Sequence, residues 1–407
     1  YTENNLSDNT RSNQSQNSVS ANLEWDIYDP KRIPDIKSSF YGLQIAKLQL
    51  EEMIRNKYLE ATSQYFLIQK TNQDINIAKQ ALEVSKLSLI EVEEKFNAGI
   101  GNKLEVLEAK TQFKRDELSL SKKKGELEKE KRNLLNLLNI KENIQFDIEK
   151  KPVILGFWSN DLEKSVQDAL NYRIVLKRYK LDILSNEQQE KSVRGDSRPT
   201  LSIYNNFSIS SSDGELNNTN PNYDSNAKNE TNIIGLKLNW LLFDGFTTKN
   251  NFKSLREKEN EIRINSSKEE ESIINELNKK FIDLNISIKN IKTSLEQVRS
   301  ARESLQISLM RLKAGITTQR EVVNNIKDLT ESEGNLNQAI TNYNLNLVTL
   351  RRQTGKDNIL NCDSYKKNLD NKNLKYSNGA SLCLEDFKLD ENLKPDFKLD
   401  KNIKVEA

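Results

Sequence analysis

The residue types that most often carry out chemistry are scarce in this chain. There is no histidine among the 407 residues, which removes the commonest general base and the commonest metal ligand. The two cysteines, Cys362 and Cys383, cannot make a four-cysteine zinc site. They form either a disulfide in an oxidising compartment or a pair of free thiols. With no phosphate-binding glycine loop and no nucleophile–base pair, we predict no enzyme activity, no metal and no cofactor.

The composition indicates long helices and not a compact globule. Only 35% of the residues are apolar, 30% are charged, and the mean hydropathy is −0.75. Helices that bury a single stripe account for this shortage of core residues. The net charge of +2 gives no argument for nucleic acid as a partner. No apolar run reaches the ~18–20 residues of a membrane-spanning helix.

A segment made of a strand, a long helix, a glycine turn and a return helix occurs twice. Trp25 corresponds to Trp240 at an offset of 240 − 25 = 215 residues, and Gly99 corresponds to Gly315 at 315 − 99 = 216. Two marks far apart with almost the same offset indicate a duplicated unit, which is longer than the roughly 20–50 residues of a solenoid repeat.

The helices of both copies are predicted from the absence of proline and from apolar spacing. Residues 35–151 and 222–394 contain no proline, as long uninterrupted helices require. In the second copy apolar residues alternate steps of four and three, the period of a left-handed coiled coil; the first copy keeps this phase more loosely. We predict helices at 35–96 and 250–312, return helices at 102–140 and 318–354, and a further helix at 162–193. Each long helix would measure about 90–95 Å.

Three segments alternate apolar and polar residues with period two, which predicts strands with one apolar face. They are 23–27, 201–210 and 236–242. Strands of about ten residues cross a bilayer when tilted. A soluble sheet resting on a core is the alternative, but no second layer is evident to cover the apolar face.

Two polar segments are predicted as external loops. They are residues 211–231 and, in the first copy, residues 1–21. By the logic of the repeat, a helix and a strand of the first copy, roughly 40–50 residues, are expected upstream of Tyr1.

In this order and duplication of elements, the chain resembles the TolC family of outer-membrane efflux channels over roughly residues 1–355. The matching segments are Leu238–Gly245, Phe96–Ala109 and Ala314–Asn324. No single motif is specific, whereas the order and the duplication together are. The resemblance implies a mainly α-helical fold with a β-barrel part. Three chains would form a trimeric α-helical tunnel across the periplasm and share a transmembrane β-barrel of about twelve strands in the outer membrane.

The resemblance also implies partners and a function. The homotrimer would be the exit duct of a tripartite efflux or type I secretion system, embedded in outer-membrane lipid. A periplasmic adaptor protein and an inner-membrane transporter would dock at the helical tip. The alternative is a coiled-coil scaffold of the cell envelope, which has no use for alternating strands that carry tryptophan.

We expect four segments along the chain. Residues 1–140 form the first repeat, 141–198 a connecting helical segment, 199–355 the second repeat, and 356–407 a polar tail that is partly disordered.

Two sets of tip residues follow from the resemblance. The adaptor-contact set is Gly99, Ile100, Gly315, Ile316 and Thr317, although a glycine can also simply end a helix with φ > 0. The pore-constriction set, six and nine residues after each glycine, is Glu321, Asn324, Glu105 and Glu108. A ring of Glu321 would attract cations. Asn324 departs from the acid that is common in the family, and a solvated helix glutamate is the alternative for Glu321.

Aromatic residues near the strand ends are candidates for the membrane–water interface. They are Trp25, Trp240, Tyr28 and Phe243. For Tyr28 and Phe243, packing at the junction between barrel and helices is an equal alternative. Independently of any resemblance, an open sheet edge in lipid leaves backbone groups unpaired. Closure then needs further copies, which cyclic symmetry supplies.

Overall fold

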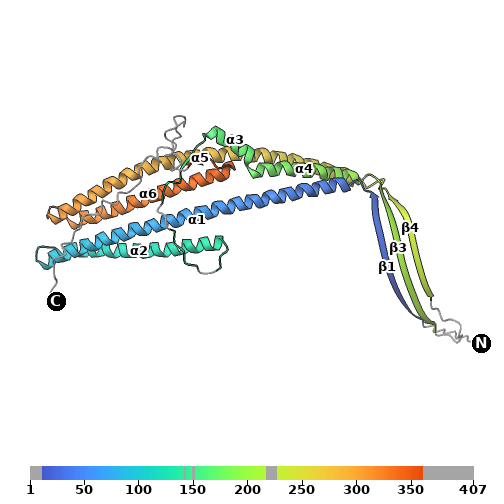
Figure 1. Cartoon of the computed structure of the whole chain (residues 1–407), viewed down its shortest axis with the longest axis horizontal. Helices are drawn as coiled ribbons and strands as arrows, with labels where there is room; N and C mark the ends of the chain where they lie inside the picture. The colour runs from blue at the N-terminus through green and yellow to red at the C-terminus, as the bar shows by residue number, and fades with distance from the viewer. Residues whose placement is uncertain (1–11, 142–143, 149–151, 217–226, 361–407) are drawn as a thin grey trace, which may run out of the picture. The chain divides into compact units, whose positions relative to one another are not determined.

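The computed structural model describes residues 12–141, 144–148, 152–216 and 227–360 (Figure 1). In chain order the elements are β1 (Ser12–Tyr28), α1 (Arg32–Asn97), α2 (Lys103–Leu137), β2 (Phe157–Trp158), α3 (Leu162–Tyr172), α4 (Ile174–Gly195), β3 (Thr200–Leu216), β4 (Ala227–Asn239), α5 (Thr247–Lys313), α6 (Gln319–Thr354) and β5 (Ile359–Leu360).

The chain folds into two compact units, and α1, α4 and α5 contribute residues to both. We call the first the strand unit; within the described residues it comprises 12–47 and 178–266. The second, the hairpin unit, comprises 48–177 and 267–360. Each of the two sequence repeats, 1–140 and 199–355, therefore supplies residues to both units.

The strand unit contains a three-stranded antiparallel sheet in the order β1-β3-β4 (Figure 1). In the ladder, Trp25 lies opposite Ile203, which lies opposite Leu236. Because side chains alternate between faces, these residues share one face with Leu23, Leu201, Ile234 and Leu238, and this part of the face is apolar apart from Asn205. Its largest side chains, among them Trp25 and Leu238, are exposed in the single chain.

The opposite face of this sheet is polar and internally bonded. The Ser202 hydroxyl donates to Asp26 Oδ1 at 2.6 Å, and Lys237 Nζ donates to Glu24 Oε1 at 2.9 Å. The ring of Tyr204 covers Gly235, where a Cβ atom would lie 2.7 Å from the phenol oxygen. Glycine is needed here because any side chain would displace this ring.

The strands are longer than the alternation predicted. β1 and β3 each span 17 residues and β4 spans 13. The ends of the segments predicted as loops, 12–21, 211–216 and 227–231, are paired in the ladder. Backbone groups make the ladder, so serine- and asparagine-rich residues continue a strand beyond the stretch whose side chains alternate.

The helices of the strand unit pack through α4. Asn186 Nδ2 donates to the Leu255 carbonyl of α5 at 2.8 Å, and the hydroxyls of Ser38 and Ser185 share a hydrogen bond of 3.1 Å. The predicted further helix is therefore present beside α1 and α5.

That predicted helix, 162–193, is not continuous. It breaks at Arg173, whose backbone is extended (ψ 125°), giving α3 and α4. The Arg173 guanidinium donates to Glu276 of α5 at 3.1 Å. The three consecutive apolar residues Ile174–Leu176 are all buried. A straight helix buries only a stripe, so a change of axis is what allows all three to reach the core.

The hairpin unit is built from two helical hairpins, α1 with α2 and α5 with α6. The long helices have 66 and 67 residues and the return helices 35 and 36. The four predicted helices are thus confirmed, each within a few residues. At ~1.5 Å per residue the long helices measure about 100 Å.

The two long helices bury different kinds of stripe. In α5 the predicted apolar stripe is buried, with Leu277 and Ile291 fully so. In α1 the buried stripe also advances by steps of three and four, but most of its members are small: Thr71, Asp74, Ala78, Ala81, Ser85, Ser88 and Val92. The sequence pattern of large apolar residues made the coiled-coil spacing of the first copy look irregular. The spacing of its buried residues is regular, but small side chains carry it.

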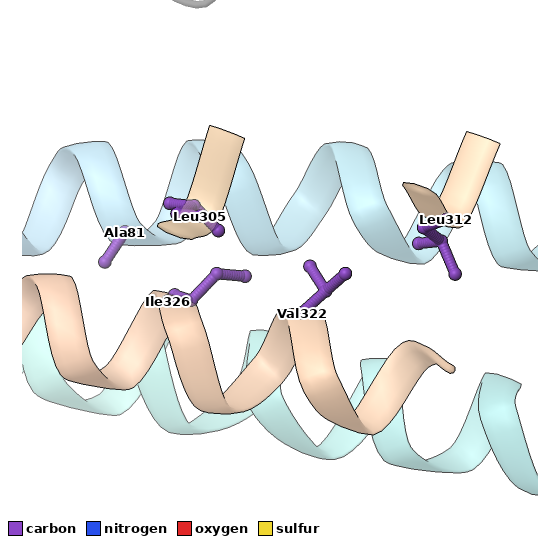
Figure 2. Packing of buried hydrophobic residues seen from close by; sticks show 5 residues of the cluster. All are labelled: Ala81, Leu305, Leu312, Val322 and Ile326. Atoms are coloured by element: carbon purple, nitrogen blue, oxygen red, sulfur yellow. The ribbon is translucent and has the colours of Figure 1, made fainter. Parts of the chain in front are cut away.

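A small residue of α1 packs against the second hairpin. Ala81 belongs to one buried cluster with Leu305 and Leu312 of α5 and Val322 and Ile326 of α6 (Figure 2). The large side chains of the second hairpin fill the space that the short side chain of α1 leaves free, which is the condition for dense packing.

A buried acid joins three helices at another level of the same stripe. Asp74 Oδ1 accepts from Asn337 Nδ2 of α6 at 2.6 Å. Asp74 Oδ2 lies 3.0 Å from Lys70 Nζ and 3.5 Å from Lys123 Nζ of α2. Because a buried carboxylate is costly without partners, these contacts favour one longitudinal register of the hairpins.

A second, small sheet pairs β2 with β5, Phe157 opposite Leu360. Trp158 Nε1 donates to Ser165 Oγ at 2.9 Å, and the Tyr343 hydroxyl donates to the Gly156 carbonyl at 2.9 Å. β5 lies in the segment predicted as a polar tail. Residues 361–407 of that tail, with Cys362 and Cys383, fall outside the described residues. None of the described helices carries a stretch long and apolar enough to cross a membrane.

We predict that Ala81→Leu destabilises the hairpin unit by about 1–3 kcal/mol, because it overpacks a dense interface. Thermal unfolding followed by helical circular dichroism measures the effect. Gln80→Leu adds a leucine at the neighbouring exposed position and serves as the control. Equal midpoints for the two variants would contradict the close packing of α1.

Candidate functional site: the helical tip

The two hairpins end in turns with the same geometry. Gly99 and Gly315 have φ of +78° and +73°. In each turn the glycine N–H donates to the carbonyl three residues back, at 3.0 and 3.1 Å. The next N–H donates to the carbonyl five residues back, at 3.0 and 2.9 Å. This is the Schellman arrangement, so the helix-ending role of both glycines is present in the structure.

The residues after the glycines form the exposed part of the turns. Ile100 is 80% exposed and Ile316 is 68% exposed, while Thr317 is half-buried. Large apolar side chains that protrude at both turns are suited to contact with another protein. Their role as an adaptor surface remains a prediction.

Glu321 is held by two side chains from the same hairpin. Arg311 Nη1 of α5 donates to Glu321 Oε1 at 3.1 Å, and the Thr317 hydroxyl donates to Oε2. Both members of the ion pair are partly exposed. The carboxylate therefore has one cation and one hydroxyl within hydrogen-bond distance, while it stays partly exposed to solvent.

Glu108 is held from the other hairpin. Arg320 of α6 donates to Glu108 Oε1 through Nε at 3.1 Å and Nη2 at 2.5 Å, which joins α6 to α2. This hydrogen bond raises the pKa of the Arg320 guanidinium. Asn324 is exposed, and Glu105 has no cation within ion-pair distance among the described residues. Glu105 is thus the uncompensated acid of the four predicted constriction residues.

Two further contacts tie the hairpins together close to their turns. The Gln319 amide donates to Ser88 Oγ at 2.7 Å, with both side chains buried. Lys95 Nζ donates to the Leu312 carbonyl at 3.0 Å, so a cation of α1 lies at the C-terminal end of α5, where it is favourable.

Sequence reasoning missed Arg311, Arg320, Gln319 and Lys95. Arg320 lies one residue before Glu321 in the sequence, yet its partner is on the other hairpin, and no local pattern indicates that pairing. Among the described residues no group of histidine, cysteine or acidic side chains could hold a metal ion.

The predicted interface aromatics lie in the strand unit and are all exposed. Trp25 is on the apolar face of the sheet, and Tyr28 follows a register shift at the end of β1. Trp240 Nε1 donates to the Ser197 carbonyl at 3.2 Å. Phe243 meets Phe246 edge to face at 5.7 Å. Trp25 and Tyr28 lie in the last four residues of β1, Trp240 directly follows β4, and Phe243 lies four residues beyond it. The membrane-interface role of all four remains a prediction.

Comparison with known proteins gives a family and a fold. The sequence profile of the family described as "Outer membrane efflux protein" matches residues 1–139 and 165–356. No curated protein sequence matches the chain. A membrane protein from Pseudomonas aeruginosa has a similar structure, with a TM-score of 0.68 and 11% identity over 85% of this chain and 82% of that one.

Two further structures are similar at comparable levels. The outer-membrane channel OprN gives a TM-score of 0.67 and 15% identity, covering 85% of this chain and 81% of that one. The CmeC outer membrane channel of Campylobacter jejuni gives 0.62 and 15% identity, covering 89% and 80%. At these identities the likeness to solved structures establishes the fold.

We predict that Gly315→Ala lowers stability by about 1–2 kcal/mol, because a side chain disfavours the left-handed conformation. No atom lies within 4 Å of the added Cβ, so the cost is conformational. Gly334→Ala in α6, which is equally unhindered, should instead raise stability by about 0.5–1 kcal/mol. Thermal midpoints that shift in the same direction for both variants would contradict the assigned turn.

Proposed function

Because this chain belongs to the outer membrane efflux protein family, we propose that three copies of it form one passive exit channel. The family provides the outer-membrane component of tripartite efflux systems, with adaptor and inner-membrane partners. The protein is an outer-membrane efflux channel that extends into the periplasm. The proposal concerns how copies assemble, which residues line the narrow end, and whether the partner machine is an efflux pump or a type I secretion system.

The observation that carries the proposal is the sheet of the strand unit. Its outer strands, β1 and β4, have no further strand beside them among the described residues. One face is apolar and exposed, and the other is polar and internally bonded. In lipid an open edge would leave a row of backbone groups unpaired. Neighbouring copies would pair these edges, place the apolar face toward lipid and enclose the polar face as a channel.

A stripe on α1 supports assembly between copies. Within the strand unit, Ile33, Ile36, Phe40 and Leu43 are exposed and separated by steps of three, four and three residues. This spacing places them on one face of the helix with coiled-coil periodicity. A soluble single chain would leave this face in water, whereas a helix of the next copy would cover it.

For the narrow end, we propose that Glu105, Glu108, Glu321 and Asn324 of each copy line the constriction. The arginine partners of Glu108 and Glu321 reduce the negative field that these carboxylates impose on passing ions. The exposed turns, with Gly99, Ile100, Gly315, Ile316 and Thr317, would contact the adaptor. The channel performs no chemistry in this proposal, and the inner-membrane partner supplies the energy for transport.

The oligomeric mass and the planar-bilayer conductance of detergent-extracted full-length protein test the assembly. We expect a trimer with a conducting pore. Phe40→Glu should lower the trimeric fraction several-fold because it places a charge in the covered stripe. Ser39→Glu, at the adjacent exposed position, is the matched control. A soluble monomer or dimer without conductance would refute the channel assembly.

Two substitutions that each remove one charge are expected to shift the cation-to-anion permeability ratio in opposite directions, and so test the constriction. Glu321→Gln removes a carboxylate and should lower the cation-to-anion permeability ratio. Arg311→Gln removes its partner at 3.1 Å and should raise the ratio, because the carboxylate then acts unpaired. Reversal potentials under a salt gradient measure both variants. An unchanged ratio in both would remove Glu321 from the constriction.

A further inference from the structure

An open cavity of about 340 Å³ lies in the strand unit, beside the end of β4 and the first turns of α5. Its lining includes Arg194 at the end of α4, Leu241 and Leu242 after β4, and Phe246 and Lys249 at the start of α5. The lining thus combines two cationic groups with large apolar side chains, all supplied by the strand unit.

The two acids of the cavity are already engaged. Asp196 accepts from Lys31 Nζ at 2.8 Å. Asp244 accepts from the backbone N–H of Thr248 at 2.6 Å, which caps α5 and, together with the Thr248 hydroxyl, lowers the pKa of this carboxyl group. Neither acid is therefore an unengaged counter-ion for a further cation in the cavity.

The two cations contact aromatic rings and not carboxylates. The Arg194 guanidinium lies 4.3 Å from the centroid of Phe252, and Lys249 Nζ lies 5.7 Å from that of Phe246. Within the described ranges, neither has a carboxylate at ion-pair distance. Arg194 interacts electrostatically with Glu190, but burial, together with Glu259, raises the pKa of Glu190, which weakens it as a competitor.

Apolar side chains continue from the sheet to the rim of this cavity. Leu242 lies three residues beyond the end of β4, which carries Leu236 and Leu238 on the apolar face, and it is 77% exposed. Leu241, Phe243 and Phe246 are also exposed. So many large apolar side chains at one exposed place indicate contact with a partner or a membrane. Their position directly after β4, whose apolar face is exposed, favours the membrane.

We propose that this cavity binds the headgroup of an anionic phospholipid from the leaflet that faces the helices. Arg194 and Lys249 hold the phosphate, and Leu242 and Phe246 contact the first part of the acyl chains. The inference rests on the proposed function, since it requires the apolar face of the sheet to lie in a bilayer. The ligand class of the cavity would then be anionic phospholipid, and the two cations would bind its phosphate close to the aromatic residues of the strand ends.

A lipid fits this surface better than a free anion does. Inorganic phosphate would use the two cations alone and leave the adjacent apolar row in water. A phospholipid contacts both the two cations and the apolar row. Its charged headgroup lies at the membrane–water interface, and its acyl chains extend from there into the hydrocarbon. Two cations close to a bilayer surface each add about fivefold to the affinity for anionic lipid.

The test uses full-length protein in detergent, exchanged into nanodiscs of phosphatidylcholine with added phosphatidylglycerol. Native mass spectrometry after release counts the phosphatidylglycerol molecules that stay bound. We expect selective retention by the natural protein and a loss of about tenfold or more in Arg194→Gln/Lys249→Gln. Lys253→Gln, an exposed lysine one turn further along α5, should retain lipid.

Each outcome decides the inference. Equal retention by the double variant and Lys253→Gln would overturn it, and full competition by inorganic phosphate would assign the cavity to a soluble anion instead. Oligomeric mass and conductance are recorded on the same samples. A conducting trimer without selective retention would refute the headgroup site alone, whereas loss of the trimer in the natural protein would refute the channel assembly.

Discussion

The packing of α1 against the second hairpin is the constraint on which the hairpin unit depends. Along one stripe of α1 the buried side chains are mostly short, and in the cluster around Ala81 the residues from α5 and α6 are large. Polar groups of the same stripe also reach the second hairpin. Asp74 meets Asn337, and Ser88 meets Gln319, at distances of 2.6 and 2.7 Å. Apolar packing and polar hydrogen bonds therefore join the hairpins along the same stripe.

The backbone hydrogen-bonding groups of the strand unit are paired in a different way. A helix bonds its backbone internally, so both hairpins can be complete within one chain. The sheet cannot be complete in this sense, because its outer strands have free edges among the described residues and its apolar face is exposed. A single sequence thus combines a unit that buries a core within one chain with a unit whose sheet, among the described residues, leaves its outer edges unpaired and its apolar face exposed.

Much of the architecture was predictable because it is encoded locally. Helix ends at Gly99 and Gly315 follow from the need for positive φ, and the period-two segments predict which face of the sheet is apolar. The strand ends were not predictable from alternation, since polar residues such as Ser211 and Ser212 pair through their backbone groups. The break at Arg173 and the ion pairs of Arg311 and Arg320 were missed because their partners are set by tertiary packing. For the same reason, the candidate constriction could be placed along the chain but its electrostatics could not.

The contrast between the two long helices has an evolutionary consequence. After a duplication the two copies begin with equal side chains along their buried stripes. At a shared interface, smaller side chains in one copy can then be compensated by larger side chains in the other. Here one buried stripe of the first copy is rich in alanine and serine, whereas the buried stripe of the second is rich in leucine and isoleucine. Substitutions in the two stripes then cost stability for opposite reasons. Larger side chains destabilise the first copy by overpacking, and smaller side chains destabilise the second by leaving cavities. Divergence between the repeats would therefore be compensated across the interface, position by position, and the copies would no longer be interchangeable.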